Sequence, residues 1–173
     1  MARRPVIIAP DKRLKVRSTK VETIDAAVLT LLDDMLETMY AEDGIGLAAI
    51  QVGVPKRLVV ADVHGKDEPP APIKLINPEI VMVNDEIVVH EEGCLSLPEQ
   101  FAEVERPSVA RIRYLDEAGV EHERDFSGVL AICLQHEIDH LEGILFVDHI
   151  SSIRRNIILR KLQKTKRLEA AEA

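Results

Sequence analysis

The chain has 173 residues, of which 46% are hydrophobic and 30% charged, a composition typical of one soluble globular domain with a substantial core. No apolar run approaches the roughly 18 residues of a membrane span, and the start, MARRPVIIAP, lacks the apolar stretch of a secretion signal. The net charge is −8, and we expect a cytoplasmic protein that has neither DNA nor a membrane as a partner.

Hydrophobic spacing predicts the elements of the first half of the chain. Residues 24–40 hold apolar side chains at helical intervals, which predicts an amphipathic helix. Three glycines and a closing proline in residues 41–55 predict irregular structure. RLVVADV, residues 57–63, predicts a buried strand, and the proline-rich residues 66–72 predict a surface loop after it.

The second half predicts strands followed by a long helix. Residues 74–85 and 86–98 predict two strands, and alternation of apolar and polar residues around DEAG predicts an antiparallel hairpin over 109–126. A helix is predicted from residue 127 or 128 to residue 141, with Gly143 as its C-cap. Because strands and helices do not alternate regularly, we predict an α+β fold with antiparallel or mixed sheets packed around this helix.

The last segment differs in charge from the rest of the chain. Residues 151–168 contain seven Lys or Arg and no acid, whereas residues 1–150 contain 28 acids and 15 bases, a net charge of −13. We therefore expect a single domain over residues 1–150 and a basic C-terminal helix within 151–173 that has its own partner. The apolar side chains expected to pack this helix on the domain are Ile150, Ile153, Ile157 and Leu162.

The predicted helix before Gly143 carries QHEIDH, in which His136 and His140 are four residues apart and Glu137 follows the first. Helical spacing stacks the two imidazoles on one face. This HExxH pattern indicates two metal ligands and a carboxylate that can take a proton from bound water. The alternative is a pair of core histidines beside a chance glutamate. The histidines continue an apolar stripe formed by Val129, Ile132 and Cys133.

A catalytic metal site needs a third protein ligand and an open position. Cys94, in EEGCLSLP, is the candidate, because Gly93 lets the backbone approach closely and a thiolate is a strong ligand. A small buried residue is the usual alternative for a free cysteine. Cys133 is interpreted in that way, as a residue that lines a pocket.

The segment GIGLAAIQVG, residues 44–53, indicates a place where the backbone can bind a ligand. Two glycines bracket Ile45, so the backbone can hydrogen-bond an extended ligand, and Gln51 brings an amide donor suited to an oxyanion. By itself such a segment is more often only a turn.

Three motifs, GIGLAAIQ, EGCLS and QHEIDH, occur in an order that resembles the signature of peptide deformylases, and the resemblance extends from about Pro5 to the basic helix. It implies a hydrolase that removes the formyl group from the N-terminal formyl-methionine of new polypeptides and releases formate. Residues 1–150 would then be the catalytic metallohydrolase domain. The resemblance also implies Cys94, His136 and His140 as ligands of one Fe(II) per chain, although the donor set equally suits Zn, Ni or Co.

The same resemblance implies roles for further residues. Glu137 would take the proton of the attacking water and deliver it to the departing amine. The Gln51 amide and the Leu95 backbone N–H would stabilise the oxyanion. The expected substrate-binding residues are Ile45, Gly46, His90, Glu92, Val129, Ile132 and Cys133.

Two residues depart from the family pattern. An aliphatic residue is common at the position of His90, and some relatives carry arginine where this chain has Phe101. Glu92 and Arg106 are expected to form an ion pair that braces the Cys94 segment, or else a solvated pair.

Similar basic tails in this family dock on the ribosome near the exit tunnel, which implies the same partner for residues 151–173.

Two alternatives to the deformylase function stay open. The first is an HExxH metallo-endopeptidase, which would take its third ligand downstream, from Glu142 or His149. The second is a metal-stabilised adaptor that only binds ribosomes, although a structural zinc site would normally have four protein ligands.

Overall fold

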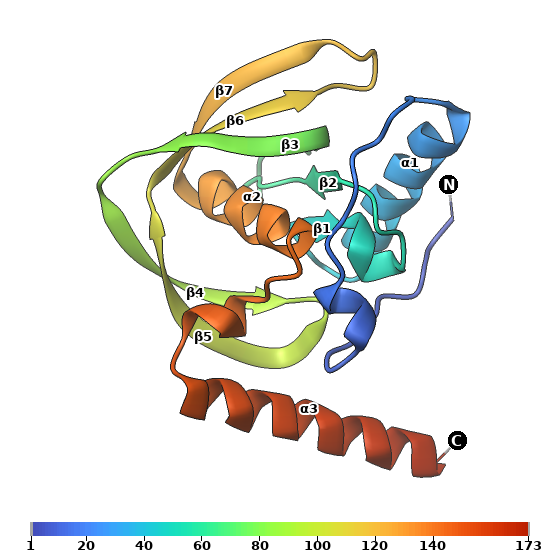
Figure 1. Ribbon diagram of the computed structural model, residues 1–173, viewed down its shortest axis with the longest axis vertical. Helices are drawn as coiled ribbons and strands as arrows, with labels where there is room; N and C mark the ends of the chain where they lie inside the picture. Colours follow the sequence, from blue (N-terminus) through green and yellow to red (C-terminus); the bar gives the residue numbers. More distant parts are fainter. Residues whose placement is uncertain (1, 173) are drawn as a thin grey trace.

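The computed structural model describes residues 2–172 and has an α+β architecture, as predicted (Figure 1). Its helices, strands and short 3-10 turns follow one another along the chain. They are η1 Lys12–Lys15, α1 Ala26–Ala41, β1 Gly46–Ala48, η2 Ala49–Val52, β2 Leu58–Ala61, β3 Ile73–Val83, β4 Ile87–Cys94, β5 Leu97–Pro107, β6 Val109–Leu115, β7 Glu121–Ser127, α2 Gly128–Leu141, η3 Phe146–His149 and α3 Ser152–Glu172.

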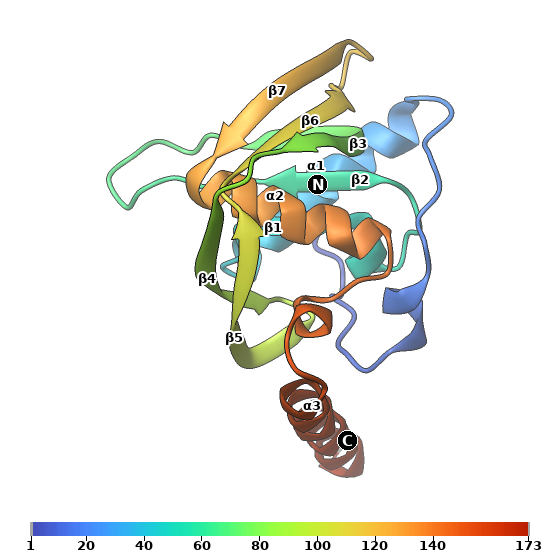
Figure 2. The same cartoon turned by 60° about the vertical axis from the view of Figure 1, so that its left-hand side comes forward.

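The strands form two antiparallel sheets on either side of α2. The larger sheet has the order β1-β2-β3-β6-β7, and β4 and β5 form the second, two-stranded sheet. Figure 2 shows α2 running between the larger sheet and the β4–β5 ribbon. The HExxH helix is therefore the central element of the molecule, as the sequence predicted.

Strand β2 shows why the larger sheet is sandwiched between helices. Successive strand residues point to opposite faces. Leu58 and Val60 pack in the cluster that contains the apolar face of α1, whereas Val59 and Ala61 pack in the cluster that contains α2. Both faces are buried, so the strand reads as a continuous apolar run rather than as an alternating one.

Local signals account for where the two body helices begin and end. The side chain of Asp25, the N-cap of α1, accepts a hydrogen bond of 3.0 Å from the Val28 backbone N–H. Helix α2 has Glu142 as its C-cap, one position before the predicted cap Gly143, which follows with φ +75°. A left-handed residue at this point is a common helix stop.

The sequence prediction missed strand β1 and most of strand β5. β1 lies inside the segment 41–55 that was predicted to be irregular, because three residues with a glycine among them carry too short a pattern. Most of β5 was not predicted either. Its inward-facing positions include the charged Arg106 beside the apolar Ala102 and Val104, so the alternation is not purely hydrophobic.

The C-terminal helix α3 packs on the body through a different face from the one predicted. Ile158 and Leu162 are buried, whereas Ile153 and Ile157 are 73% and 47% exposed, so the prediction was wrong for these two isoleucines. The phase of a helix is fixed by what it packs against, and β5 and η3 receive the Ile158 side. Ile150 is partly buried against the same cluster, as expected.

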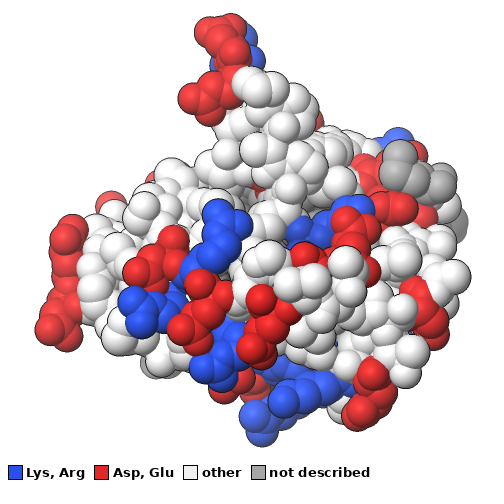
Figure 3. All heavy atoms as spheres, turned by 90° about the horizontal axis from the view of Figure 1, so that it is seen from above, with Lys and Arg blue, Asp and Glu red and all other residues white. Residues whose placement is uncertain are grey.

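Charged side chains of both signs are intermixed on the face over the β6–β7 end of the molecule (Figure 3). Two cross-strand ion pairs contribute to this pattern, Arg111 with Asp125 and Arg113 with Glu123. None of the helices in the described part of the chain combines the length and the hydropathy needed to cross a bilayer.

Candidate metal centre and substrate cavity

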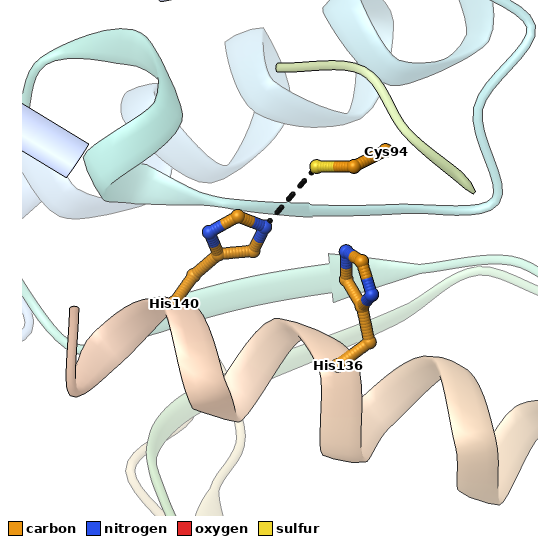
Figure 4. Close-up of side chains that lie close together, drawn as sticks. All are labelled: Cys94, His136 and His140. Atoms are coloured by element: carbon orange, nitrogen blue, oxygen red, sulfur yellow. Dashed lines mark hydrogen bonds between the residues drawn. The ribbon is translucent and has the colours of Figure 1, made fainter. Parts of the chain in front are cut away.

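Three potential metal-binding side chains converge between α2 and the end of β4 (Figure 4). Helix α2 presents His136 and His140 one turn apart, and Cys94 closes β4 opposite them. Their donor atoms all lie within 4.8 Å of one another, and Cys94 Sγ is 3.3 Å from His140 Nε2. Tetrahedral coordination places such donors roughly 3.3–3.6 Å apart. The three residues therefore fit one metal ion after small side-chain movements.

The chemistry of His140 also fits a metal ligand. Its side chain is fully buried, and its Nδ1 has no hydrogen-bond partner among the described residues. Burial lowers the pKa of His140 well below its usual value, and the nearby His136 acts in the same direction. The imidazole is therefore neutral, with a ring nitrogen free to coordinate.

His136 is oriented by a buried carboxylate. Its Nδ1 lies 2.8 Å from Glu92 Oε1, which leaves Nε2 to face the cluster. Arg106 binds the same carboxylate twice, at 2.5 and 2.9 Å, and also binds Asp139 at 2.9 Å. A carboxylate behind a ligating histidine fixes its ring and raises its basicity. The expected ion pair between Glu92 and Arg106 is thus present, and it is buried rather than solvated.

Glu137 lies beside the candidate ligands, with its Oε1 3.9 Å from His136 Nε2. It is 4% exposed, and its Oε2 has no partner among the described residues. Burial raises the pKa of Glu137 to about 7, although the attraction of His136 opposes this rise. A bound cation would lower this pKa again. A carboxyl group that titrates near neutral pH can accept a proton and return it.

The backbone of β1 passes directly over Glu137. A Cβ on Gly46 would lie 2.8 Å from Glu137 Oε1 and 2.7 Å from Cys133 Sγ. Glycine is therefore the residue that permits this approach. Burial raises the pKa of the Cys133 thiol, so it stays protonated, and its Sγ donates a hydrogen bond of 3.5 Å to the Ile45 carbonyl.

The amide of Gln51 is held toward Cys94. Its Oε1 accepts a hydrogen bond of 2.9 Å from the Ala48 backbone N–H. Its Nε2 lies 3.0 Å from Ser96 Oγ and 3.5 Å from Cys94 Sγ. The orientation of the amide is thus fixed, with its donor side next to the sulfur.

A cavity of about 360 Å³ opens beside this cluster, and neither Gln51 nor His140 is among the described residues that line it. Its walls include the side chains of Cys94, Leu95, His136 and Glu137. All seven residues expected to bind substrate line it as well, including His90, whose Nδ1 is buried without a partner among the described residues. They are Ile45, Gly46, His90, Glu92, Val129, Ile132 and Cys133.

The two downstream candidates for the third ligand are engaged elsewhere. Glu142 pairs with Arg57 at 2.7 Å and with Arg17 at 2.8 Å. His149 Nε2 lies 2.8 Å from Asp139 Oδ2. Neither belongs to the cluster that residues 2–172 bring together.

Sequence reasoning missed two residues that support this site. Ser96 holds the Gln51 amide, and Asp139 holds Arg106. Both lie inside quoted motifs, EGCLS and HEIDH, so their position next to the ligands was the signal that could have identified them.

Comparison with known proteins identifies the family of this chain. The family model for polypeptide deformylases matches residues 3–156. The peptide deformylase of Rhizobium meliloti is 51% identical over 100% of this chain and 99% of its own, and that of Rhizorhabdus wittichii is 52% identical over 99% of both. The crystal structure of the Ehrlichia chaffeensis peptide deformylase in complex with actinonin aligns with a TM-score of 0.92, at 43% identity over 96% of this chain and 99% of that one. The chain therefore belongs to the peptide deformylase family.

Proposed function

We propose that Cys94, His136 and His140 hold the metal ion with which this peptide deformylase works. The enzyme removes the N-formyl group from the N-terminal formyl-methionine of new polypeptides and releases formate. The observation that carries the assignment is the convergence of three donor atoms within 4.8 Å of one another, two of them from residues that line a cavity. A metal bound there would supply Lewis-acid activation of water and of the formyl oxygen.

The remaining steps are assigned to side chains of this chain. Glu137 takes the proton of the attacking water and passes it to the amine that departs, because its carboxyl is buried beside the donors and its Oε2 has no partner among the described residues. The Gln51 amide and the Leu95 backbone N–H donate to the formyl oxygen as negative charge develops on it. The methionine side chain enters the cavity among the seven substrate-binding residues named above, with the neutral Cys133 at its inner wall.

Formate release from formyl-Met-Ala-Ser tests this assignment. Protein purified without oxygen should release formate rapidly, and Glu137→Gln should lower kcat by about 10² or more because the proton carrier is lost. Glu142→Gln removes a carboxylate just past the same helix and should retain activity, since Glu142 pairs with arginines outside the cavity. Full activity in Glu137→Gln, or cleavage of internal peptide bonds, would contradict the proposal.

Metal content tests the ligand set independently of turnover. Cys94→Ala should lose stoichiometric metal, measured by elemental analysis of the purified protein, because two imidazoles alone bind far more weakly. Glu142→Ala and His149→Ala should keep one metal per chain. Full retention of metal in Cys94→Ala would exclude the thiolate as a ligand.

We further propose Fe(II) as the native ion, one per chain, with nickel or cobalt able to replace it and zinc giving a poorly active protein. A thiolate beside a redox-active ion is prone to oxidation, which accounts for an expected loss of activity in air. Reconstitution with each metal and measurement of turnover per bound ion tests this preference. Equal turnover with zinc, or stability of the iron form in air, would contradict it.

The basic helix α3 is proposed to dock the enzyme on the ribosome near the exit tunnel, where its substrate emerges in the cytoplasm. In this view residues 1–150 form the catalytic domain and residues 151–173 the appended docking segment. Support comes from seven bases without an acid over 151–168, next to a body with a net charge of −13. Ribosome cosedimentation should weaken with salt and should be lost when the chain ends at Ile150. A folded charge-reversal variant, Arg160→Glu/Arg167→Glu, should weaken it too, and unchanged binding in both would refute the docking role.

A further inference from the structure

A second hollow, of about 210 Å³, lies between β5 and α3. We call it the α3 groove. It is lined by Gln100 and Phe101 from β5 and by Arg154, Ile157, Ile158 and Lys161 from α3. These four α3 residues fall at i, i+3, i+4 and i+7, so they form one face of the helix. Figure 1 shows α3 lying along the β5 side of the body.

Phe101 joins this groove to the substrate cavity. Its side chain lines both hollows. The ring lies against the backbone at Gly93, where an added Cβ would be 2.7 Å from Phe101 Cε1. Gly93 itself lines the substrate cavity and precedes the proposed ligand Cys94. A chain that leaves the cavity past Gly93 therefore crosses the Phe101 ring and arrives at α3.

The groove has the chemistry of a peptide-binding surface. Phe101 is 59% exposed and Ile157 is 47% exposed, so two large apolar side chains face solvent at one hollow. Exposed apolar groups gathered at one place mark a binding surface more often than isolated ones do. The groove and the substrate cavity share Phe101 in their walls, so a polypeptide held in the cavity is the ligand nearest to the groove.

The charges of the groove favour acidic side chains. Arg154 and Lys161 flank Ile157, and neither side chain forms an ion pair with any residue in 2–172. The exposed acids Glu99 and Glu103 flank Phe101 along β5 but do not line the groove. An acidic peptide residue would thus meet two unpaired cations inside the groove, whereas a basic one would meet only the acids outside it.

We propose that the α3 groove is an extended substrate subsite that binds residues of the formylated polypeptide beyond its first three, with a preference for an apolar residue followed by acidic ones. Two extended residues span roughly 7 Å, about the width of the phenylalanine side chain that separates the hollows. The downstream residues therefore reach α3 while the formyl-methionine occupies the cavity. This inference rests on the proposed placement of formyl-methionine over the Cys94 cluster, and it gives α3 a role in substrate selection in addition to docking.

Three blocked peptides test the proposal, formyl-Met-Ala-Ser-amide and its extensions by Leu-Glu-Glu and by Leu-Lys-Lys. The measured quantity is the ratio of kcat/KM for each long peptide to that for the short one. The acidic extension should raise the ratio about five-fold or more, chiefly through KM, and the basic extension should not. Salt should reduce the difference, because exposed charge pairs are screened.

A matched pair of variants locates the effect. Arg154→Glu/Lys161→Glu should abolish the preference for the acidic extension, and Ile157→Ser should reduce it. Arg160→Glu/Arg167→Glu makes the same change of charge on the same helix away from the groove and should preserve the preference. Affinity for the deformylated acidic product, measured by fluorescence anisotropy, should follow the same order without requiring turnover.

Four results would overturn the subsite. The first is an equal ratio for the two extensions, and the second is an equal loss of the acidic preference in the two charge-reversal variants. The third is a preference that is confined to kcat, with no change in product affinity. The fourth is a ratio that falls as the protein is concentrated. The last result would mean that a second copy of the chain covers the groove. Lack of activity on the short peptide itself would instead contradict the assignment of the catalytic site, so the two failures are distinguishable.

Discussion

At the scale of single residues, the close approach of β1 to Glu137 predicts that Gly46 is essential for turnover. Gly46→Ala would place a methyl group 2.8 Å from Glu137 Oε1 and 2.7 Å from Cys133 Sγ. Both side chains are packed in the cavity wall, so the carboxylate must move. A displacement of about 1 Å in a catalytic group can lower the rate by about 10².

The Gly46→Ala enzyme should thus lose about 10² in kcat while it keeps its metal. Gly65→Ala is the control, because a Cβ at Gly65 would meet only the flexible side chain of Glu68. Kinetics and metal analysis on both variants check this expectation. A wild-type kcat in Gly46→Ala would show that Glu137 does not need its present position.

Some residues of the site could be predicted from the sequence, and others could not. Spacing alone paired His136 with His140, since both lie on one helix and helical geometry is regular. Cys94 could be proposed only from its motif, because its distance from the histidines depends on how β4 folds back toward α2. The contact of the buried Arg106 with Glu92 was expected. Its second contact, with Asp139, was not, because a sequence does not reveal which further side chain the fold brings to the same arginine.

At the scale of elements, the β4–β5 ribbon is attached to α2 through buried charge. Arg106 and Glu92 are 4% and 5% exposed, and the arginine also reaches Asp139 on the helix. Removal of one member of a buried pair leaves the other charge without compensation. Arg106→Leu should therefore lower the free energy of unfolding by about 3–5 kcal/mol.

Chemical denaturation of Arg106→Leu and Arg111→Leu provides the comparison. Arg111 pairs with Asp125 on the surface, where solvent screens the charges, so its loss should matter far less. The double variant Glu92→Gln/Arg106→Leu should recover part of the stability, because neither member of the buried pair is then charged. Equal effects of the two arginine substitutions would mean that the buried pair contributes no more than a surface pair.

Helix α1 is tied to the N-terminal segment by Asp34, which gives a pH-dependent contribution. The Ala2 backbone N–H donates to Asp34 at 2.7 Å, and the Arg4 guanidinium binds it at 2.9 Å. The hydrogen bond from Ala2 lowers the pKa of Asp34, burial opposes this shift, and Arg4 lowers the pKa further. The folded pKa lies below the unfolded value of about 3.9. This stabilisation is therefore complete above pH about 4 and is lost as the pH falls through the folded pKa.

Asp34→Asn should accordingly lower the free energy of unfolding by about 1–2 kcal/mol at pH 7. Its deficit relative to the unsubstituted chain should shrink as the pH falls below 4. Urea denaturation at pH 7, 5 and 3 measures this difference. Asp33→Asn removes the same charge from the same helix, and an identical pH dependence in both variants would contradict a specific role for Asp34.

The elements themselves were predicted where periodicity is long and missed where it is short or interrupted. The helices α1 and α2 follow from apolar spacing over four turns, and β6–β7 follows from alternation around a tight turn. β1 carries only three residues, and β5 alternates through a charged residue whose burial depends on its partners. The orientation of α3 was wrong for Ile153 and Ile157 because Ile157 and Ile158 are adjacent, so composition alone does not decide which of them faces the body.

At the scale of the whole molecule, α3 is connected to the proposed metal site through a shared core. Ile158 and Leu162 belong to the cluster that contains Phe146, and the Phe146 ring stacks on His136 with centroids 6.2 Å apart. Lys166 also reaches back to the backbone carbonyls of Ile8 and Pro10. Helix α3 directs most of its charged side chains outward, but its buried apolar side chains thus still help to support His136, a proposed ligand.

This shared core predicts that α3 unfolds together with the body rather than separately. Leu162 is 3% exposed, and Leu162→Ala should lower the free energy of unfolding of the entire chain by about 2–4 kcal/mol, within one cooperative transition. Leu168→Ala removes the same atoms from the same helix at a position that is 56% exposed and should change stability by no more than about 0.5 kcal/mol. Far-UV circular dichroism during denaturation, followed in parallel with metal release, distinguishes the two cases. If Leu162→Ala instead melted a helical fraction early and left metal release unchanged, α3 would be an independent appendage that moves without any effect on the proposed metal site.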